Sequence, residues 1–328
     1  MPERPRTLAY RSLSKLFFLL PKRGTRKIPV YRTLYHSLYE SMWSFWPPDN
    51  ILDVQGSKML LEVFHPNPTL RNTFRSYALL RVHEKNTTEL FQKVLRPGNT
   101  FLDLGANVGY FSLLAARLVG KTGQVFSFEP EPTNFRYLTQ NLRINGYEQV
   151  RPEPKAVSDS PGLVKLYICP YDSGHHTINQ PEGIRSYRPE YDYREEQFIE
   201  VEKVRLDDYF PDLRVDVIKM DVEGAELLAL TGMDRLIRRQ ENLRMFVEFF
   251  PLLIREMGGS PEEFIRRILE DYRFSAFVIG GDYSTPAEIG NRKYFRVNQV
   301  GDLLRLCRGK NDHLNLFLKK GRDQNRLS

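Results

Sequence analysis

The chain changes character near residue 99, where short apolar runs begin to alternate with amphipathic stretches. The apolar runs predict strands. The stretches between them, which begin at capping residues or proline and end near glycine, predict helices. This alternation is typical of a parallel sheet with helices on both faces. The predicted strands cover residues 100–104, 124–128, 216–220, 244–249 and 274–279, and the predicted helices cover 108–118, 132–145, 224–240 and 264–271.

The rest of the chain divides around this α/β region. A basic, aromatic-rich arm comes first, followed by a small cap whose short apolar runs and turn residues predict antiparallel strands. A long crossover between residues 155 and 210 contains strand-like pieces at 163–168 and 198–204, and the run 313–319 predicts a final edge strand. The arm, the cap, the α/β domain and a polar tail are predicted at residues 1–50, 51–98, 99–320 and 321–328.

Composition narrows the class of protein. The chain is 41% hydrophobic and 27% charged, which is ordinary for a soluble globular protein. Its net charge is +7, but residues 1–36 contain nine Arg or Lys and a single acid, so the remainder is close to neutral. Charge confined to the arm argues against a nucleic-acid-binding surface spread over the fold.

The basic arm and the cysteines indicate where in the cell the protein is expected. The apolar run 16–20 is far too short to span a bilayer. With the basic residues beside it, this run predicts either a peripheral contact with an anionic membrane or a loosely ordered or packed arm. Two cysteines are too few for a disulfide framework and fit a reducing compartment, so we expect a cytoplasmic protein.

The first motif, FLDLGANVGYFSLLAA at 101–116, predicts a buried strand that turns directly into a helix. We expect Gly105 where the backbone passes close to a ligand and Gly109 where the helix packs on the strand. Asp103 is expected at the strand end, facing the ligand crevice, and Asn107 stands where a dinucleotide fingerprint needs glycine. The carboxylate of Asp103, before the first glycine, would repel a pyrophosphate but would suit an ammonium group, such as that of S-adenosylmethionine (SAM).

The second motif, FSFEPEPTNF at 126–135, places Glu129 at the end of the next predicted strand. A carboxylate in this position can accept hydrogen bonds from both hydroxyls of a ribose. The alternative is an acid favoured only by the dipole of the following helix. Beside the first motif, ribose binding is the better interpretation.

The third motif, VDVIKMDVEGAELLAL at 215–230, ends a predicted central strand in charged residues. Strand alternation places Lys219, Asp221 and Glu223 on one side, at the carboxyl end of the strand, where α/β sheets bind ligands. Because buried charges need partners, a purely structural pair between Lys219 and a carboxylate is the alternative. Glu248, near the end of the following strand, is expected to border an acceptor pocket.

The chain resembles the FkbM-type methyltransferases in the segments LDLGANVGYFSLLA, FEPEPTNFRYLTQNL, VRLDDY at 204–209 and IKMDVEGAE at 218–226. The resemblance covers roughly residues 80–320 and implies the class I, Rossmann-like methyltransferase fold, with a seven-stranded, mostly parallel sheet, and SAM as methyl donor. It also implies an active-site edge at Asp221 and Glu223. The donor contacts that it implies are Asp103, Gly105, Asn107, Gly109 and Glu129.

Two histidines lie in the crossover loop YDSGHHTIN. The resemblance places this loop near the donor methyl group, where His175 or His176 could act as general base; a solvated pair of loop residues is the alternative. Adjacent histidines rarely bind one ion and no metal-type spacing is present, so no metal site is predicted, although a carboxylate-bound Mg²⁺ stays open.

The leading interpretation is a SAM-dependent O-methyltransferase that modifies a hydroxyl of a sugar, a glycolipid or a secondary metabolite. Asp221 or a loop histidine would help to remove the hydroxyl proton. One alternative is a nicotinamide-dependent oxidoreductase, against which Asp103 and Asn107 argue. Another is a non-catalytic protein that binds an adenosyl ligand, against which the acidic set of Asp103, Glu129, Asp221 and Glu223 argues. N- and C-methylation also remain open.

Overall fold

The computed structural model describes residues 40–41, 43–44, 49–170, 173–178, 197–282, 289–290, 292–307 and 312–321. The chain forms two compact units, residues 1–82 and residues 83–328. The predicted basic arm lies almost entirely outside the described residues, and so does its expected membrane contact. In the part of the chain that the structure describes, no helix is long and apolar enough to cross a membrane.

The first unit contains a hairpin followed by a helix. Strands β1 (Ile51–Val54) and β2 (Ser57–Leu60) pair antiparallel, with Gln55 and Gly56 at positive φ in the two-residue turn between them. Helix α3 (Pro68–Leu80) follows; it begins at Asn67, whose side chain accepts a hydrogen bond from the Thr69 N–H.

The second unit is built on one sheet of eight strands in the order β12-β11-β13-β10-β9-β3-β4-β5. The five strands from β5 to β10 are parallel, and β13 inserts antiparallel between β10 and β11. The strands are β3 (Thr100–Leu104), β4 (Gln124–Phe128), β5 (Val150–Glu153), β9 (Val217–Met220), β10 (Arg244–Phe249), β11 (Ser275–Ile279), β12 (Tyr294–Val297) and β13 (Leu314–Lys319).

This order confirms the class I methyltransferase fold, with two differences from the prediction. The sheet has an eighth strand, because β12 pairs antiparallel with the outer side of β11. The run 313–319 does not form an edge strand: β13 is hydrogen-bonded on both sides, and all six of its residues are buried. A strand buried on both faces needs apolar residues throughout, which the run LNLFLK largely supplies.

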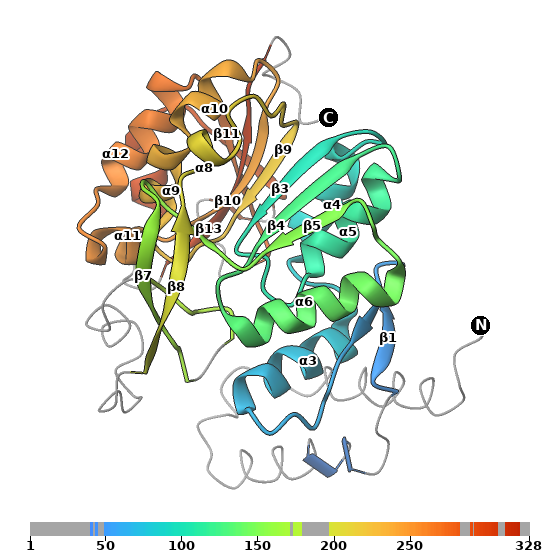
Figure 1. Cartoon of the computed structure of the whole chain (residues 1–328). Helices are drawn as coiled ribbons and strands as arrows, with labels where there is room; N and C mark the ends of the chain where they lie inside the picture. Colours follow the sequence, from blue (N-terminus) through green and yellow to red (C-terminus); the bar gives the residue numbers. More distant parts are fainter. Residues whose placement is uncertain are drawn as a thin grey trace, which may run out of the picture. The chain divides into compact units, whose positions relative to one another are not determined.

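Helices cover both faces of the sheet; in Figure 1, α4 and α5 lie on one face and α10 and α12 on the other. The predicted helix over 224–240 is two helices, since α9 ends at Gly232, where a Cβ atom would lie 1.9 Å from the Ser158 carbonyl oxygen. The helices are α4 (Lys85–Val94), α5 (Tyr110–Val119), α6 (Pro132–Asn145), α8 (Leu206–Tyr209), α9 (Glu226–Gly232), α10 (Asp234–Arg239), α11 (Pro251–Glu256), α12 (Pro261–Arg266) and α13 (Val300–Leu306), with a π-helical turn η2 (Arg267–Asp271) after α12.

The crossover before β9 carries a small sheet of its own. Strands β6 (Ala156–Val157), β8 (Phe198–Val204) and β7 (Gly162–Tyr167) form it in that order, close to the two strand-like pieces predicted from the sequence. The described part of the loop after β7, residues 173–178, is joined to this sheet by a bridge between Tyr167 and Thr177. The loop that carries both histidines is therefore held at the end of β7.

Candidate active site

The turn after β3 brings the first and third sequence motifs into direct backbone contact. Gly105 has a φ of 85°, and a Cβ atom on it would lie 1.9 Å from the Asp221 carbonyl oxygen. The chain segment that directly follows β9 is thus sufficient to require a residue without a side chain here, and the expected approach of a ligand stays a prediction. Gly109 has a φ of 99°, and a Cβ atom on it would lie 2.9 Å from Leu138 Cδ1 of α6. Its small size therefore permits close packing of helix on helix, whereas we expected packing of the helix on the strand.

Glu129 directly follows β4 and is almost fully buried. One carboxylate oxygen accepts a 2.8 Å hydrogen bond from the Asn107 N–H, and the other accepts a 2.9 Å bond from the Glu131 N–H. Burial raises the pKa of Glu129 to about 8, although these two hydrogen bonds favour the charged form. Each carboxylate oxygen has a second lone pair, so the group could also accept hydrogen bonds from ligand hydroxyls.

Asp103 lies in β3, one residue before the end of the strand, and is only 1% exposed; its predicted place facing the ligand crevice stays a prediction. Its Oδ2 accepts a 2.6 Å hydrogen bond from Ser112 of α5, whose hydroxyl also contacts Ser127 at 2.7 Å. Its Oδ1 is buried without a hydrogen-bond partner among the described residues. Burial raises the pKa of Asp103 to about 6, opposed by the positive charge of Lys219.

Lys219 and Asp221 form the pair that was the alternative interpretation of the third motif. Lys219 Nζ donates a 2.7 Å hydrogen bond to Asp221 Oδ2, and the ammonium also lies 4.7 Å from the ring centroid of Phe111. Burial alone would lower the pKa of Lys219, but Asp221 and the nearby Glu84 and Asp103 outweigh it and raise that pKa. Burial alone would raise the pKa of Asp221, but the charge and hydrogen bond of Lys219 outweigh burial and lower that pKa. Both groups are therefore charged.

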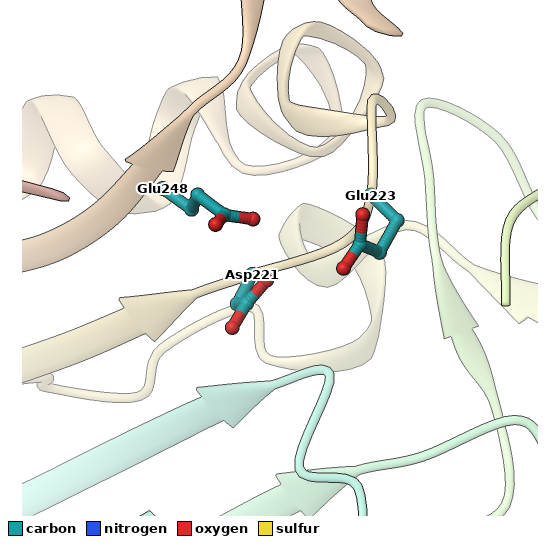
Figure 2. Close-up of side chains that lie close together, drawn as sticks. All are labelled: Asp221, Glu223 and Glu248. Atoms are coloured by element: carbon teal, nitrogen blue, oxygen red, sulfur yellow. The ribbon is translucent and has the colours of Figure 1, made fainter. Parts of the chain in front are cut away.

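Asp221 is also one of three carboxylates that lie close together. Carboxylate oxygens of Asp221, Glu223 and Glu248 all lie within 4.8 Å of one another. Figure 2 shows them converging from the end of β9, the turn that follows it and the neighbouring strand β10. Oxygen donors grouped in this way could hold a hard divalent cation or accept hydrogen bonds from a hydroxyl-bearing ligand. The sequence did not indicate how closely they would approach.

The proton affinity of Glu248 is raised by its surroundings. Burial raises its pKa well above the ordinary value, and the charges of Asp221, Glu223 and Glu84 add to this effect, while His175 opposes it. Its side chain also makes a hydrogen bond to Asp221 that lowers the pKa of Asp221, which makes Glu248 the protonated donor of the two.

The loop 173–178 separates the two predicted histidines. His175 lies close enough to Glu248 to influence its charge, whereas His176 Nδ1 accepts a 3.0 Å hydrogen bond from the Cys169 N–H. The structure therefore brings His175 toward the carboxylates, while His176 supports the conformation of its own loop.

Three residues that the sequence analysis passed over connect this loop to the motifs. The Ser173 carbonyl oxygen accepts hydrogen bonds from the side-chain amides of Asn134, at 2.9 Å, and Asn107, at 3.4 Å. The Thr177 hydroxyl donates a 2.7 Å bond to the Glu223 carbonyl oxygen. These contacts join residues up to 66 positions apart, so no local pattern in the sequence could have indicated them.

The chain matches the model of the methyltransferase FkbM domain over residues 103–276. It is 34% identical over 161 residues to the methyltransferase sdnD of Sordaria araneosa, covering 42% of this chain and 62% of that protein. It is 30% identical over 164 residues to the 31-O-demethyl-FK506 methyltransferase FkbM of Streptomyces tacrolimicus, covering 43% and 61%. The chain thus spans about three fifths of the length of these relatives.

Among solved structures, the methyltransferase FkbM of Methylobacillus flagellatus KT aligns with a TM-score of 0.39 and 16% identity, covering 76% of this chain and 53% of that one. The FkbM domain match takes in the turn after β3, Glu129, the crossover loop and all three carboxylates, and it extends over more than half of the chain. The protein belongs to the FkbM methyltransferase family.

Proposed function

We propose that this protein is a SAM-dependent O-methyltransferase that modifies a hydroxyl group of a sugar, a glycolipid or a secondary metabolite. The observation that carries the proposal is the placement of carboxylates along one edge of the sheet. Glu129 directly follows β4, Asp221 directly follows β9 beside the turn of β3, and Glu248 lies near the end of β10. In a class I fold this edge is where the ligands bind.

The residues at β3 and β4 fit the donor. Glu129 would accept hydrogen bonds from the ribose hydroxyls through the lone pairs that the Asn107 and Glu131 N–H groups leave over. Asp103, whose Oδ1 is buried without a hydrogen-bond partner among the described residues, would supply negative charge beneath the methionine portion. Bound SAM would bring a methyl group already activated by its sulfonium charge.

The residues at β9 and β10 would then serve the acceptor. The negative charge of Asp221, held in place by Lys219, would orient an acceptor hydroxyl and favour positive charge nearby. Glu223 and Glu248 would border the same space, and the loop with His175 and His176 would limit it on the crossover side. The name of the Streptomyces tacrolimicus relative, a 31-O-demethyl-FK506 methyltransferase, supports oxygen as the methylated atom.

Two measurements test the proposal. SAM or S-adenosylhomocysteine should raise the melting temperature, while NAD(P) should leave it unchanged; stabilisation by NAD(P) alone would favour the oxidoreductase alternative. Labelled methyl groups from SAM should appear in one fraction of an extract of the source organism separated into glycans, lipids and small metabolites. Binding of SAM without any transfer of label would instead support a non-catalytic adenosyl-binding protein.

A further inference from the structure

We propose that Glu248 is the proton acceptor for the methylated hydroxyl, in place of Asp221 or either loop histidine. This inference rests on the proposed function and assigns one of its chemical steps. The family match and the relatives establish no role for this residue.

Topology places Glu248 on the acceptor side of the site. In the order β10-β9-β3-β4, the proposed donor contacts belong to the β3 and β4 side, and Glu248 lies two strands away from β3 on β10. Its carboxylate points back toward Asp221 and Glu223 across the end of β9 (Figure 2), with oxygens of the three groups within 4.8 Å. A hydroxyl between these carboxylates would lie within reach of Glu248.

The ion pair makes Asp221 the weaker base of the two. Asp221 Oδ2 is bound by Lys219 at 2.7 Å, and a carboxylate paired in this way holds its negative charge instead of taking up a proton. Among the described residues, no Lys or Arg forms an ion pair with Glu248. The charged groups that face Glu248 are Asp221, Glu223 and Glu84, which favour its protonation, and His175, which opposes it.

A hydrogen bond within the loop argues against His176 as the base. His176 Nδ1 is occupied by the Cys169 N–H, which leaves His176 a structural role in the loop. His175 lies near enough to Glu248 to favour its ionised form. In this assignment His175 is a positioning residue that favours the charged form of the base.

The Glu248 proton first passes to solvent through Asp221, its hydrogen-bond partner and the more exposed of the two, with 22% of its side chain accessible. The acceptor oxygen then forms a bond to the methyl carbon, the carbon–sulfur bond of the donor breaks, and the hydroxyl proton passes to the Glu248 carboxylate. The sulfur keeps the electron pair of the broken bond, and no oxidant or further reactant is needed.

The test uses the full chain with Glu248→Gln, which keeps the shape of the side chain and a hydrogen-bond donor toward Asp221. Glu226→Gln is the matched control, because Glu226 is another buried glutamate of this region, and its Oε1 accepts a hydrogen bond from the Gly224 N–H. Rates of label transfer from SAM into the extract fraction methylated by the wild type are measured from about pH 6 to about pH 10. Infrared spectra of ligand-free protein over the same range report the carbonyl stretch of protonated carboxyl groups.

We expect Glu248→Gln to bind SAM within a few-fold of the wild type, to lose about 100-fold or more in rate and to lose the rise of rate with pH. Its infrared spectrum should lack one protonated carboxyl band that the wild type shows near neutral pH. Glu226→Gln should keep both the rate and the rise with pH.

The inference is overturned if Glu248→Gln keeps the wild-type rate and pH profile, or lacks no carboxyl band near neutral pH. It is also overturned if a chelator abolishes activity and a divalent cation restores it, because Glu248 would then serve a cation. If the wild type itself transfers no label, the proposed function fails and the assignment fails with it; normal transfer by both proteins removes the assignment alone.

Discussion

The backbone of Gly105 lies so close to Asp221 that a Cβ atom on residue 105 would stand 1.9 Å from the Asp221 carbonyl oxygen. The Asp221 N–H in turn donates a 3.0 Å hydrogen bond to the Leu104 carbonyl oxygen. The ends of β3 and β9 are therefore locked together at the point where the proposed donor and acceptor regions meet. A change in one strand end will move the other.

Gly105→Ala should therefore be damaging for two reasons, a positive φ and a backbone clash. Strain at the φ of 85° costs on the order of 1–3 kcal/mol, and forced displacement of packed groups costs about as much again. We expect a loss of several kcal/mol in denaturant unfolding together with weaker SAM binding. Gly146→Ala is the control, because it has a φ of 64° with no atom within 4 Å of the added Cβ and should lose only about 1 kcal/mol. Equal losses in the two variants would contradict the clash.

Asp221→Asn should lower turnover much more than donor affinity. We expect SAM affinity within a few-fold of the wild type and a rate lower by about 100-fold, since the charge beside the reacting groups is removed. The free energy of unfolding should also fall, by up to about 3–5 kcal/mol, because buried Lys219 loses its 2.7 Å partner.

The double variant Lys219→Met/Asp221→Asn separates the two effects. It should regain stability in denaturant unfolding, because no charge is left unpaired, while single-turnover transfer stays slow. If activity returns together with stability, Asp221 serves only to neutralise Lys219.

Glu129→Ala should weaken SAM binding at least about tenfold, because charge-assisted hydrogen bonds to the ribose are worth roughly 1.5–3 kcal/mol each. The pKa of Glu129 is raised to about 8 by burial, so the wild-type affinity should increase as the pH rises through that value and the carboxylate forms. Calorimetry at about pH 6.5 and about pH 9 measures both effects. Unchanged affinity in the Ala variant would remove the ribose assignment.

The same raised pKa predicts the pH dependence of stability without ligand. A carboxyl whose folded pKa lies above its ordinary value of 4.5 contributes stability that is fully present below 4.5 and is lost as the pH rises through about 8. The free energy of unfolding of the wild type should therefore fall between about pH 5 and about pH 9. In Glu129→Gln, which has no carboxyl at this position, the fall should be smaller by on the order of 1–3 kcal/mol. Denaturant midpoints across this range provide the measurement, and parallel curves for the two proteins would contradict the burial effect.

Asp282 caps a helix almost 200 residues away in sequence. Its Oδ1 accepts a 2.7 Å bond from the Asn86 N–H, and its Oδ2 accepts bonds from the Thr87 N–H and hydroxyl at 2.9 and 2.6 Å. The residue before α4, Glu84, makes no side-chain capping bond itself. Asp282→Ala should therefore cost about 1–2 kcal/mol in thermal or denaturant unfolding, and Asp282→Asn, which keeps an acceptor oxygen, should cost less. No difference between the two variants would argue against capping.

The local sequence determined the fold because it was consistent over short distances. The strands at β3, β4, β8 and β10 begin and end where the apolar runs do, and α6 runs from its first-turn proline to the glycine that ends it. Ser260, directly before Pro261, caps α12 by accepting a hydrogen bond from the Glu263 N–H. Apolar periodicity and capping residues act over a few positions, so they can be recognised in the sequence without the tertiary structure.

What the sequence could not determine are the relationships across the sheet. The place of β13 inside the sheet, the break between α9 and α10 at Gly232, and the cap that Asp282 gives α4 all depend on a neighbour distant in sequence. The same holds for the site: the motifs indicated Asp221 and Glu223, but only the pairing of β9 with β10 brings Glu248 against them. Burial and the charges of neighbours set the proton affinity of each carboxylate, and both are properties of the folded chain.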